Sequence, residues 1–87
     1  MITKDNLKWA FDTLTQDEVT SAMESNDDYV ALEMHTSNVG SYATLRSVDP
    51  DEQDEIESNG NLFMDKDNLL RMFVESESVN PYLIEWI

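Results

Sequence analysis

Residues 49–60 read Asp-Pro-Asp-Glu-Gln-Asp-Glu-Ile-Glu-Ser-Asn-Gly, and the rest of the chain can be placed around them. Six of the first nine residues of this stretch are carboxylates, none is a cation, and Ile56 is its only apolar residue. Asp49 is a suitable N-cap, Pro50 fits a first helical turn, and Asn-Gly at 59–60 is typical of a helix end. We therefore expect a short helix that stands as a solvated acidic ridge and forms no part of a core.

The segments after the acidic stretch predict a strand followed by two helices. Residues 61–64, Asn-Leu-Phe-Met, suit a short strand, and Asp65 is a cap for a helix that reaches about residue 76. Apolar residues cover a wide arc of that helix, so we expect it to be the centre of the core. The pair Asn80-Pro81 is a further cap and first turn, and it predicts a short terminal helix.

The segments before the acidic stretch begin with two predicted helices, over residues 2–14 and 15–24. Each opens on a threonine cap and carries apolar residues at helical spacing. We expect Ile2 to pack on Leu7 as a hydrophobic staple. Trp9 falls off the apolar face of the first helix.

Two strand-like runs follow, over residues 29–36 and 41–48, and the four residues between them end in glycine, which suits a hairpin. In the first run, apolar and polar side chains alternate, which predicts one buried and one solvated face. The alternating residues are Val30, Leu32 and Met34 against Glu33 and His35.

The pattern as a whole predicts a single α+β domain over residues 1–87. It has two N-terminal helices, a β-hairpin extended to a small antiparallel sheet, a short acidic helix and a central C-terminal helix. A hydrophobic content of 40% supports a folded chain. The absence of cysteine excludes disulfides and thiolate metal sites and fits a cytoplasmic protein. No window resembles a membrane span or a signal segment, so we expect the protein to remain in the cytoplasm.

The sequence does not predict an enzyme, because the parts of an active site are missing. His35 is the only histidine, and alternation places it on the solvated face of a strand. Two glycines in the whole chain leave no glycine-rich phosphate loop. The acidic stretch also departs from a calcium loop, since its sixth residue is Asp54 and its twelfth is Gly60. We expect no catalytic residue, no cofactor and no dedicated metal site.

The net charge of −14 disfavours direct binding to nucleic acid or to anionic membranes and favours a basic partner. Acids three or four residues apart on a helix lie about 5–6 Å from one another, so the acidic helix would carry a row of anions that resembles one phosphate strand. We assign partner contact to its carboxylates, Asp49, Asp51, Glu52, Asp54, Glu55 and Glu57. Further candidates are Asp27, Asp28 and Trp9. If the two N-terminal helices pack beside the acidic helix, a second row of anions is expected. It would consist of Asp12, Asp17, Glu24, Asp27 and Asp28.

Small size, strong acidity, absence of cysteine and a compact α+β pattern resemble the phage-encoded inhibitors of bacterial defence. These are the anti-restriction and anti-CRISPR proteins, several of which mimic nucleic acid. The resemblance covers the whole chain in composition and includes no shared motif, so no functional residue is carried over. It implies a basic nucleic-acid-binding target, such as a defence nuclease or its complex. That target would be met by a monomer or homodimer in the cytoplasm of a host cell.

Two other interpretations remain open. An antitoxin or a small subunit of an assembly would dock through Trp9 or Trp86, with charge only steering the approach. Alternatively, the chain would be an acidic housekeeping protein of a salt-adapted organism, in which the charge maintains solubility. Trp9 itself either packs against the terminal segment, so that both belong to the core, or acts as an anchor together with Tyr29 or Tyr42.

Overall fold

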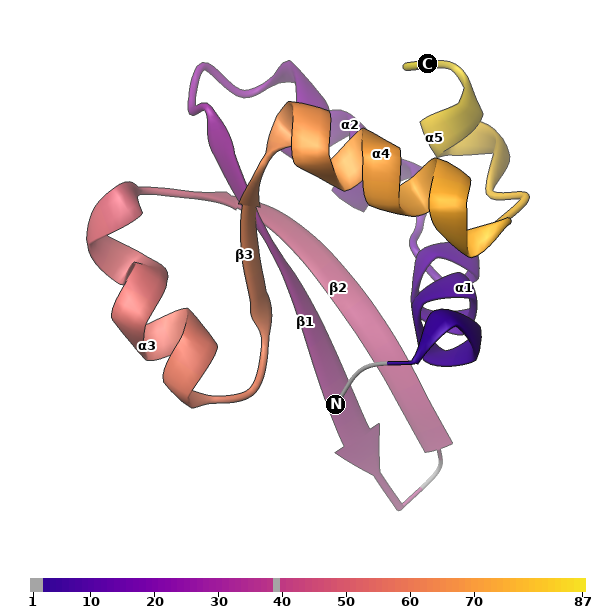
Figure 1. The fold of residues 1–87 in the computed structure, drawn as a ribbon, viewed down its shortest axis with the longest axis horizontal. Coiled ribbons are helices and arrows are strands. Elements are labelled where there is room, and N and C mark those ends of the chain that lie inside the picture. Colours follow the sequence, from indigo (N-terminus) through magenta and orange to yellow (C-terminus); the bar gives the residue numbers. More distant parts are fainter. Residues whose placement is uncertain (1–2, 39) are drawn as a thin grey trace.

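The computed structural model describes residues 3–38 and 40–87, and it confirms the predicted α+β class. Two sequence predictions, the staple at Ile2 and the hairpin turn at Val39, lie outside these ranges. Figure 1 shows the elements in chain order. They are α1 (Lys4–Asp12), α2 (Gln16–Glu24), β1 (Tyr29–Ser37), β2 (Gly40–Val48), the 3-10 turn η1 (Pro50–Glu52), α3 (Gln53–Ser58), β3 (Leu62–Asp65), α4 (Lys66–Ser76) and α5 (Pro81–Ile84).

The sheet has the strand order β2-β1-β3, and both pairings are antiparallel. β1 pairs with β2 along its whole length, from Tyr29 opposite Val48 to Ser37 opposite Gly40. β3 is shorter and pairs only with the first part of β1, ending with Leu62 opposite Leu32. The distal part of the hairpin therefore extends beyond the three-stranded region, as Figure 1 shows.

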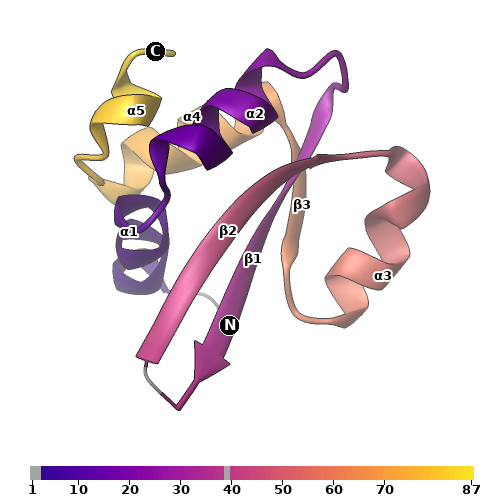
Figure 2. The same ribbon diagram turned by 180° about the vertical axis from the view of Figure 1, so that it is seen from behind.

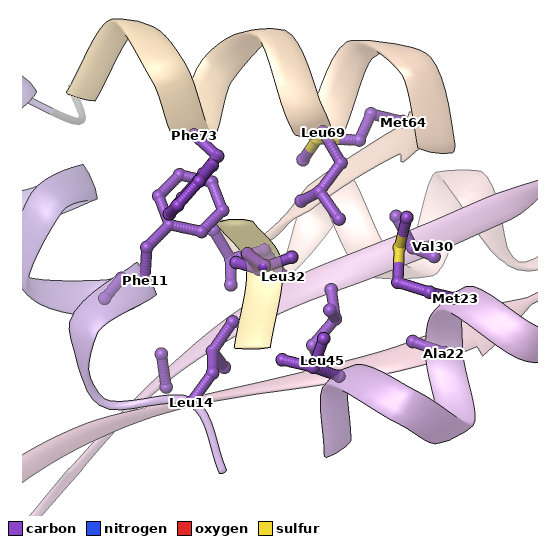
Figure 3. Packing of buried hydrophobic residues seen from close by; sticks show 14 residues of the cluster. Phe11, Leu14, Ala22, Met23, Val30, Leu32, Leu45, Met64, Leu69 and Phe73 are labelled. Atoms are coloured by element: carbon purple, nitrogen blue, oxygen red, sulfur yellow. The ribbon is translucent and has the colours of Figure 1, made fainter. Parts of the chain in front are cut away.

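The main core lies on one face of the sheet, under α1, α2, α4 and α5 (Figure 3). Leu32 and Leu45 are directly opposite each other on β1 and β2 and point into this core. Phe11 of α1 meets Phe73 of α4 edge to face, with ring centroids 5.6 Å apart. Leu69 and Phe73 are both buried, which confirms α4 as a central element of the core.

A second, smaller core lies on the opposite face of the sheet, and the sequence did not predict it. Ile56 of α3 is only 3% exposed and packs with Ala31 and Val48. The stacked rings of Tyr29 and Phe63, with centroids 5.0 Å apart, lie beside them. The expectation that the acidic stretch forms no part of a core was therefore wrong. One apolar side chain is enough to dock a helix of six residues when the sheet offers a matching patch.

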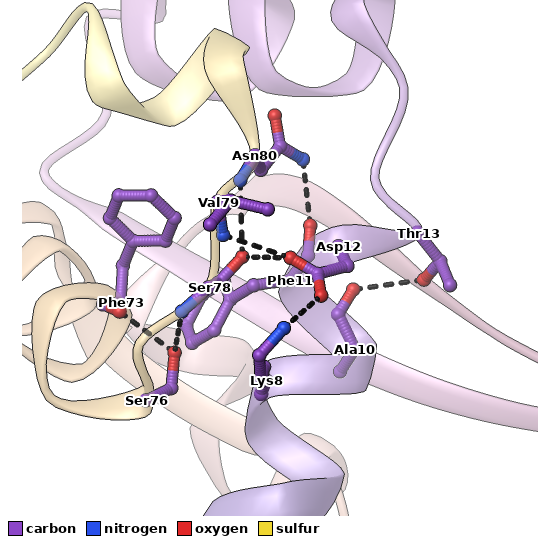
Figure 4. A network of polar contacts seen from close by, with 10 residues as sticks. All are labelled: Lys8, Ala10, Phe11, Asp12, Thr13, Phe73, Ser76, Ser78, Val79 and Asn80. Atoms are coloured by element: carbon purple, nitrogen blue, oxygen red, sulfur yellow. Dashed lines mark hydrogen bonds and ion pairs between the residues drawn. The ribbon is translucent and has the colours of Figure 1, made fainter.

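A polar network fixes the C-terminal segment to the end of α1 (Figure 4). Asn80 is 3% exposed, and its Nδ2 donates to the carbonyl oxygens of Phe11 at 2.7 Å and Leu14 at 3.1 Å. Its Oδ1 accepts the N–H of Tyr82, which is the cap that the sequence predicted. The same side chain thus begins α5 and attaches it to the joint between α1 and α2.

Candidate functional site

The predicted contact carboxylates lie on η1 and α3, which form a well-defined support. Ile56 anchors α3 on the sheet, and Gly60, with a φ of 80°, closes it by donating its N–H to the carbonyl of Glu57. At the other end, Glu52 Oε2 accepts the N–H of Asp49 at 3.1 Å, as in a capping box. Figures 1 and 2 show α3 on the opposite side of the sheet from α1, α2 and α4. The acidic residues therefore stand on a fixed helix that faces away from the main core.

Glu52 differs from the other candidates because it pairs with a cation of the chain itself. Arg46 lies between two carboxylates, with Nε 2.7 Å from Glu33 Oε1 and one guanidinium nitrogen 3.1 Å from Glu52 Oε1. Hydrogen bonding to Glu33, and then to Glu52, raises the pKa of Arg46 despite its partial burial. The N–H of Asp49 and the Arg46 guanidinium together lower the pKa of Glu52. Glu52 therefore serves the fold and is poorly suited to bind a partner.

The other five carboxylates of the acidic stretch have no cationic partner among residues 3–38 and 40–87. Glu57 accepts a hydrogen bond from the neutral amide of Gln53 at 3.3 Å. All five side chains are exposed, and they belong to Asp49, Asp51, Asp54, Glu55 and Glu57. This arrangement keeps their negative charge available to solvent or to a partner.

The chain's remaining cations are engaged elsewhere. Lys4 pairs with Glu77 at 3.2 Å, and Lys8 pairs with Asp12 at 2.9 Å. Lys66 Nζ donates to the carbonyl oxygens of Met23 and Ser25 and thereby closes the end of α2. Arg71 donates to the side chain of Asn68.

Asp27 and Asp28 are exposed and lie just before β1. Asp28 lines a hollow of about 440 Å³ together with Tyr29, Asp65, Lys66 and Asp67, so that three carboxylates surround one lysine there. Tyr29 lines the same hollow and also packs in the small core with Ile56, so this group adjoins the surface of α3. No sequence signal placed these carboxylates together, because they meet through the β1–β3 pairing, in which Tyr29 lies opposite Asp65 and the N–H of Lys66 donates to the carbonyl of Asp28.

The predicted second row of anions does not form beside the first. α1 and α2 cover the main core on the other face of the sheet, so Asp17 and Glu24 are separated from α3 by the sheet. Asp12 is engaged at the base of the C-terminal segment, where it accepts from Lys8 Nζ, Ser78 Oγ and the N–H of Val79. The condition on which this row depended, packing of the helical pair beside the acidic helix, is not met.

The two tryptophans, Trp9 and Trp86, lie in different environments. Trp9 is half-buried against the main core and lines a groove of about 420 Å³ with Asn6, Met34, His35 and Ser41. In the terminal segment, Leu83 is buried in the main core, whereas Trp86 is 39% exposed.

His35 lies on the strand face opposite the main core. Its Nε2 is 2.9 Å from Thr44 Oγ1, and its ring stacks on Tyr42 with centroids 4.9 Å apart. Within the described ranges, no group of three or more histidine or acidic side chains is placed to hold a metal ion. None of the helices described is long and apolar enough to cross a bilayer.

Comparison with known proteins adds no relative: no protein-family model, curated protein or solved structure significantly matches this chain. The surface of the chain itself is therefore the basis for a functional proposal.

Proposed function

We propose that this protein binds a basic surface of a nucleic-acid-handling protein through the exposed carboxylates of η1 and α3. It would thereby occupy the place of the phosphates and inhibit the partner. One observation carries the proposal. Five of the six carboxylates of the acidic stretch are exposed without a cationic partner in the described part of the chain, two of them at the start of the η1 turn and three on the anchored helix α3.

The fold leaves the repulsion among these carboxylates uncompensated. Acids three or four positions apart on a helix lie about 5–6 Å from one another, and like charges at this spacing are destabilising. A groove of Arg and Lys side chains that normally receives phosphates would relieve this repulsion. The net charge of −14 would in addition accelerate the encounter with a basic partner.

The test is a capture experiment with the immobilised 87-residue chain in host-cell lysate, at about 50 and 500 mM NaCl. We expect the captured protein to bind nucleic acid, to be lost at the higher salt, and to be displaced by duplex DNA or RNA. The variant to compare carries Asp51→Asn, Asp54→Asn, Glu55→Gln and Glu57→Gln. It keeps the Asp49 cap and the Arg46–Glu52 pair, which the fold uses.

A matched control removes the same charge from exposed carboxylates elsewhere, with Asp5→Asn, Asp17→Asn, Glu24→Gln and Glu85→Gln. The variant on α3 should bind the captured protein at least about tenfold more weakly than this control, which is a loss of about 1.4 kcal/mol. Equal binding by the two variants, or a partner that nucleic acid does not displace, would contradict the proposal.

A second candidate function is docking through aromatic and apolar contacts, as in an antitoxin or a small subunit. The observation in its favour is the apolar surface of the C-terminal segment, where Ile84, Trp86 and Ile87 are 48%, 39% and 65% exposed. The same capture experiment separates the two functions. Binding that survives 500 mM NaCl and is abolished by Trp86→Ala would favour this second function.

A further inference from the structure

The outer edge of β1 is only partly covered. β3 pairs with residues 29–32 of the nine-residue strand and then stops. Immediately before β3, the side chain of Asn61 extends the pairing by one step, since its Oδ1 accepts the N–H of Met34 at 3.0 Å. Past this point no strand of the described chain lies along residues 33–37 on that side.

The backbone direction at this edge follows from the Asn61 contact. Since the N–H of Met34 points toward the β3 side, the carbonyl of Met34 and the N–H and carbonyl of Thr36 point the same way. Such a row of edge groups is a template for another strand, because an extended backbone supplies matching donors and acceptors. The chemistry of the edge therefore specifies an extended peptide segment.

The other edge of the sheet is protected by a charged side chain. Glu18 of α2 reaches β2, and its Oε2 accepts the N–H of Leu45 at 3.1 Å. The carboxylate takes the position of a partner's carbonyl at this point, and α2 packs on the same strand. The middle of the β2 edge is thus occupied by this carboxylate, whereas the N–H of Thr36 on the open part of β1 faces no strand of the described chain.

A groove between α1 and the distal hairpin meets β1 at Met34, next to the open edge, and could receive a side chain of the added segment. Asn6 and Trp9 of α1, Met34 and His35 of β1 and Ser41 of β2 line it, and its volume is about 420 Å³. Successive side chains of a strand point to opposite faces of the sheet, so alternate residues of the segment would face this groove. The indole of Trp9 and the thioether of Met34 favour an apolar side chain there.

Charge selects the kind of segment. The open edge is on the β3 side of β1, and Figures 1 and 2 place α3 on that same side. The exposed carboxylates of α3 would attract lysine or arginine side chains on the segment. A second copy of this chain, itself with a net charge of −14, would be repelled.

We propose that residues 33–37 of β1 dock an extended basic segment of the partner protein, with alternate apolar and cationic side chains. The segment continues the sheet in line with β3, places an apolar side chain in the groove at Trp9 and Met34, and directs cations toward α3. The choice of a basic segment rests on the proposed function, whereas the backbone pairing rests on the open edge alone.

Three ten-residue peptides test the inference by titration into the isotope-labelled full chain, followed by NMR of the backbone amides. They alternate Lys with Val, Lys with Pro, and Glu with Val. The Lys-Pro peptide keeps the charge, but its prolines offer no N–H in the register that places the apolar side chains at the groove, so it cannot pair with the edge in that register. We expect the Lys-Val peptide to bind at least about tenfold more tightly than the other two. It should shift the amide of Thr36 and the indole of Trp9.

The variant Thr36→Pro removes the outward N–H from the edge and should reduce Lys-Val binding to the level of the Lys-Pro peptide. Circular dichroism checks that it remains folded. If the variant unfolds, the comparison of the three peptides on the unaltered chain still tests the edge pairing. Equal binding of Lys-Val and Lys-Pro, with shifts confined to residues 51–58, would overturn the edge pairing and leave the proposed function intact. Equal binding of Glu-Val, or the same shifts on raising the protein concentration alone, would overturn the basic segment as the occupant.

Discussion

At the scale of single residues, Asp12 shows how one carboxylate can be removed from the binding surface and used for the fold. It lies at the end of α1 and accepts hydrogen bonds from Ser78 Oγ, from Lys8 Nζ at 2.9 Å and from the N–H of Val79 at 3.1 Å (Figure 4). Partial burial opposes its ionisation, but these donors outweigh burial and hold the pKa of Asp12 below its usual value. The ionised form is therefore the one that attaches the C-terminal segment.

We predict that Asp12→Ala lowers the free energy of unfolding by about 1–2 kcal/mol at pH 7, as expected for the loss of hydrogen bonds to a charged group. Because the pKa is lowered in the folded state, this contribution is complete above the unfolded value of about 3.9 and is lost as the pH falls through the folded pKa. The difference between wild type and variant should thus shrink below about pH 4. Urea unfolding between pH 7 and pH 2.5 measures it.

The control for this prediction is Glu24→Ala, which removes an exposed carboxylate without a described partner. Its effect should stay within about 0.5 kcal/mol. A difference for Asp12→Ala that is the same at pH 2.5 as at pH 7 would show that the ionised carboxylate is not what holds the segment.

At the scale of elements, α3 depends on contacts with the rest of the fold for its stability. It has six residues, and isolated helices of this length are not stable in water. Its position depends on Ile56 in the small core, on the Glu52 contacts with Asp49 and Arg46, and on the Gly60 closure. The arrangement of the proposed contact carboxylates therefore depends on a few packing contacts and not on helix propensity.

We predict that Ile56→Ala destabilises the protein by about 2–4 kcal/mol, through lost burial and the cavity left behind. It should also release α3 from the sheet, so that the amides of residues 53–58 exchange hydrogen faster than those of α4. Ile84→Ala is the matched control, because Ile84 is 48% exposed and its truncation should cost far less. Equal effects of the two variants, or unchanged exchange in α3, would contradict the role given to Ile56.

At the scale of the whole molecule, the charge is largely uncompensated. Of the 19 acidic residues, only Glu77, Asp12, Glu33 and Glu52 pair with a lysine or arginine side chain in the described structure. The remaining carboxylates repel one another across a molecule whose radius of gyration is 12.1 Å, which is comparable to the Debye length of about 10 Å at 0.1 M salt. The folded state is therefore destabilised by its own charge, and this effect is screened by salt.

We predict that raising NaCl from about 20 to 500 mM increases Tm by roughly 4–8 °C, which corresponds to about 1 kcal/mol in a domain of this size. The four-residue variant on α3 described above should show a smaller increase, because part of the repulsion has been removed. Thermal unfolding followed by circular dichroism measures both. A Tm that is insensitive to NaCl, or that falls, would refute the view that like-charge repulsion limits stability.

The sequence by itself determined the elements and their order, because the signals for them are local. Thr3 Oγ1 accepts the N–H of Asn6, Thr15 Oγ1 that of Glu18, and Asp65 Oδ1 that of Asn68. Each contact spans three residues, so residue spacing alone predicts it. The alternation in β1 likewise identified the strand face that carries Leu32.

The tertiary structure alone decided which carboxylates remain available and where the sheet stays open. Glu18 Oε2 accepts the N–H of Leu45, and Asn61 Oδ1 accepts the N–H of Met34, each over 27 residues of sequence. Glu52 was assigned to the partner but lies beside Arg46, which the pairing of β1 and β2 positions. These contacts depend on how separate elements pack, and residue spacing along the chain carries no information about distances between elements.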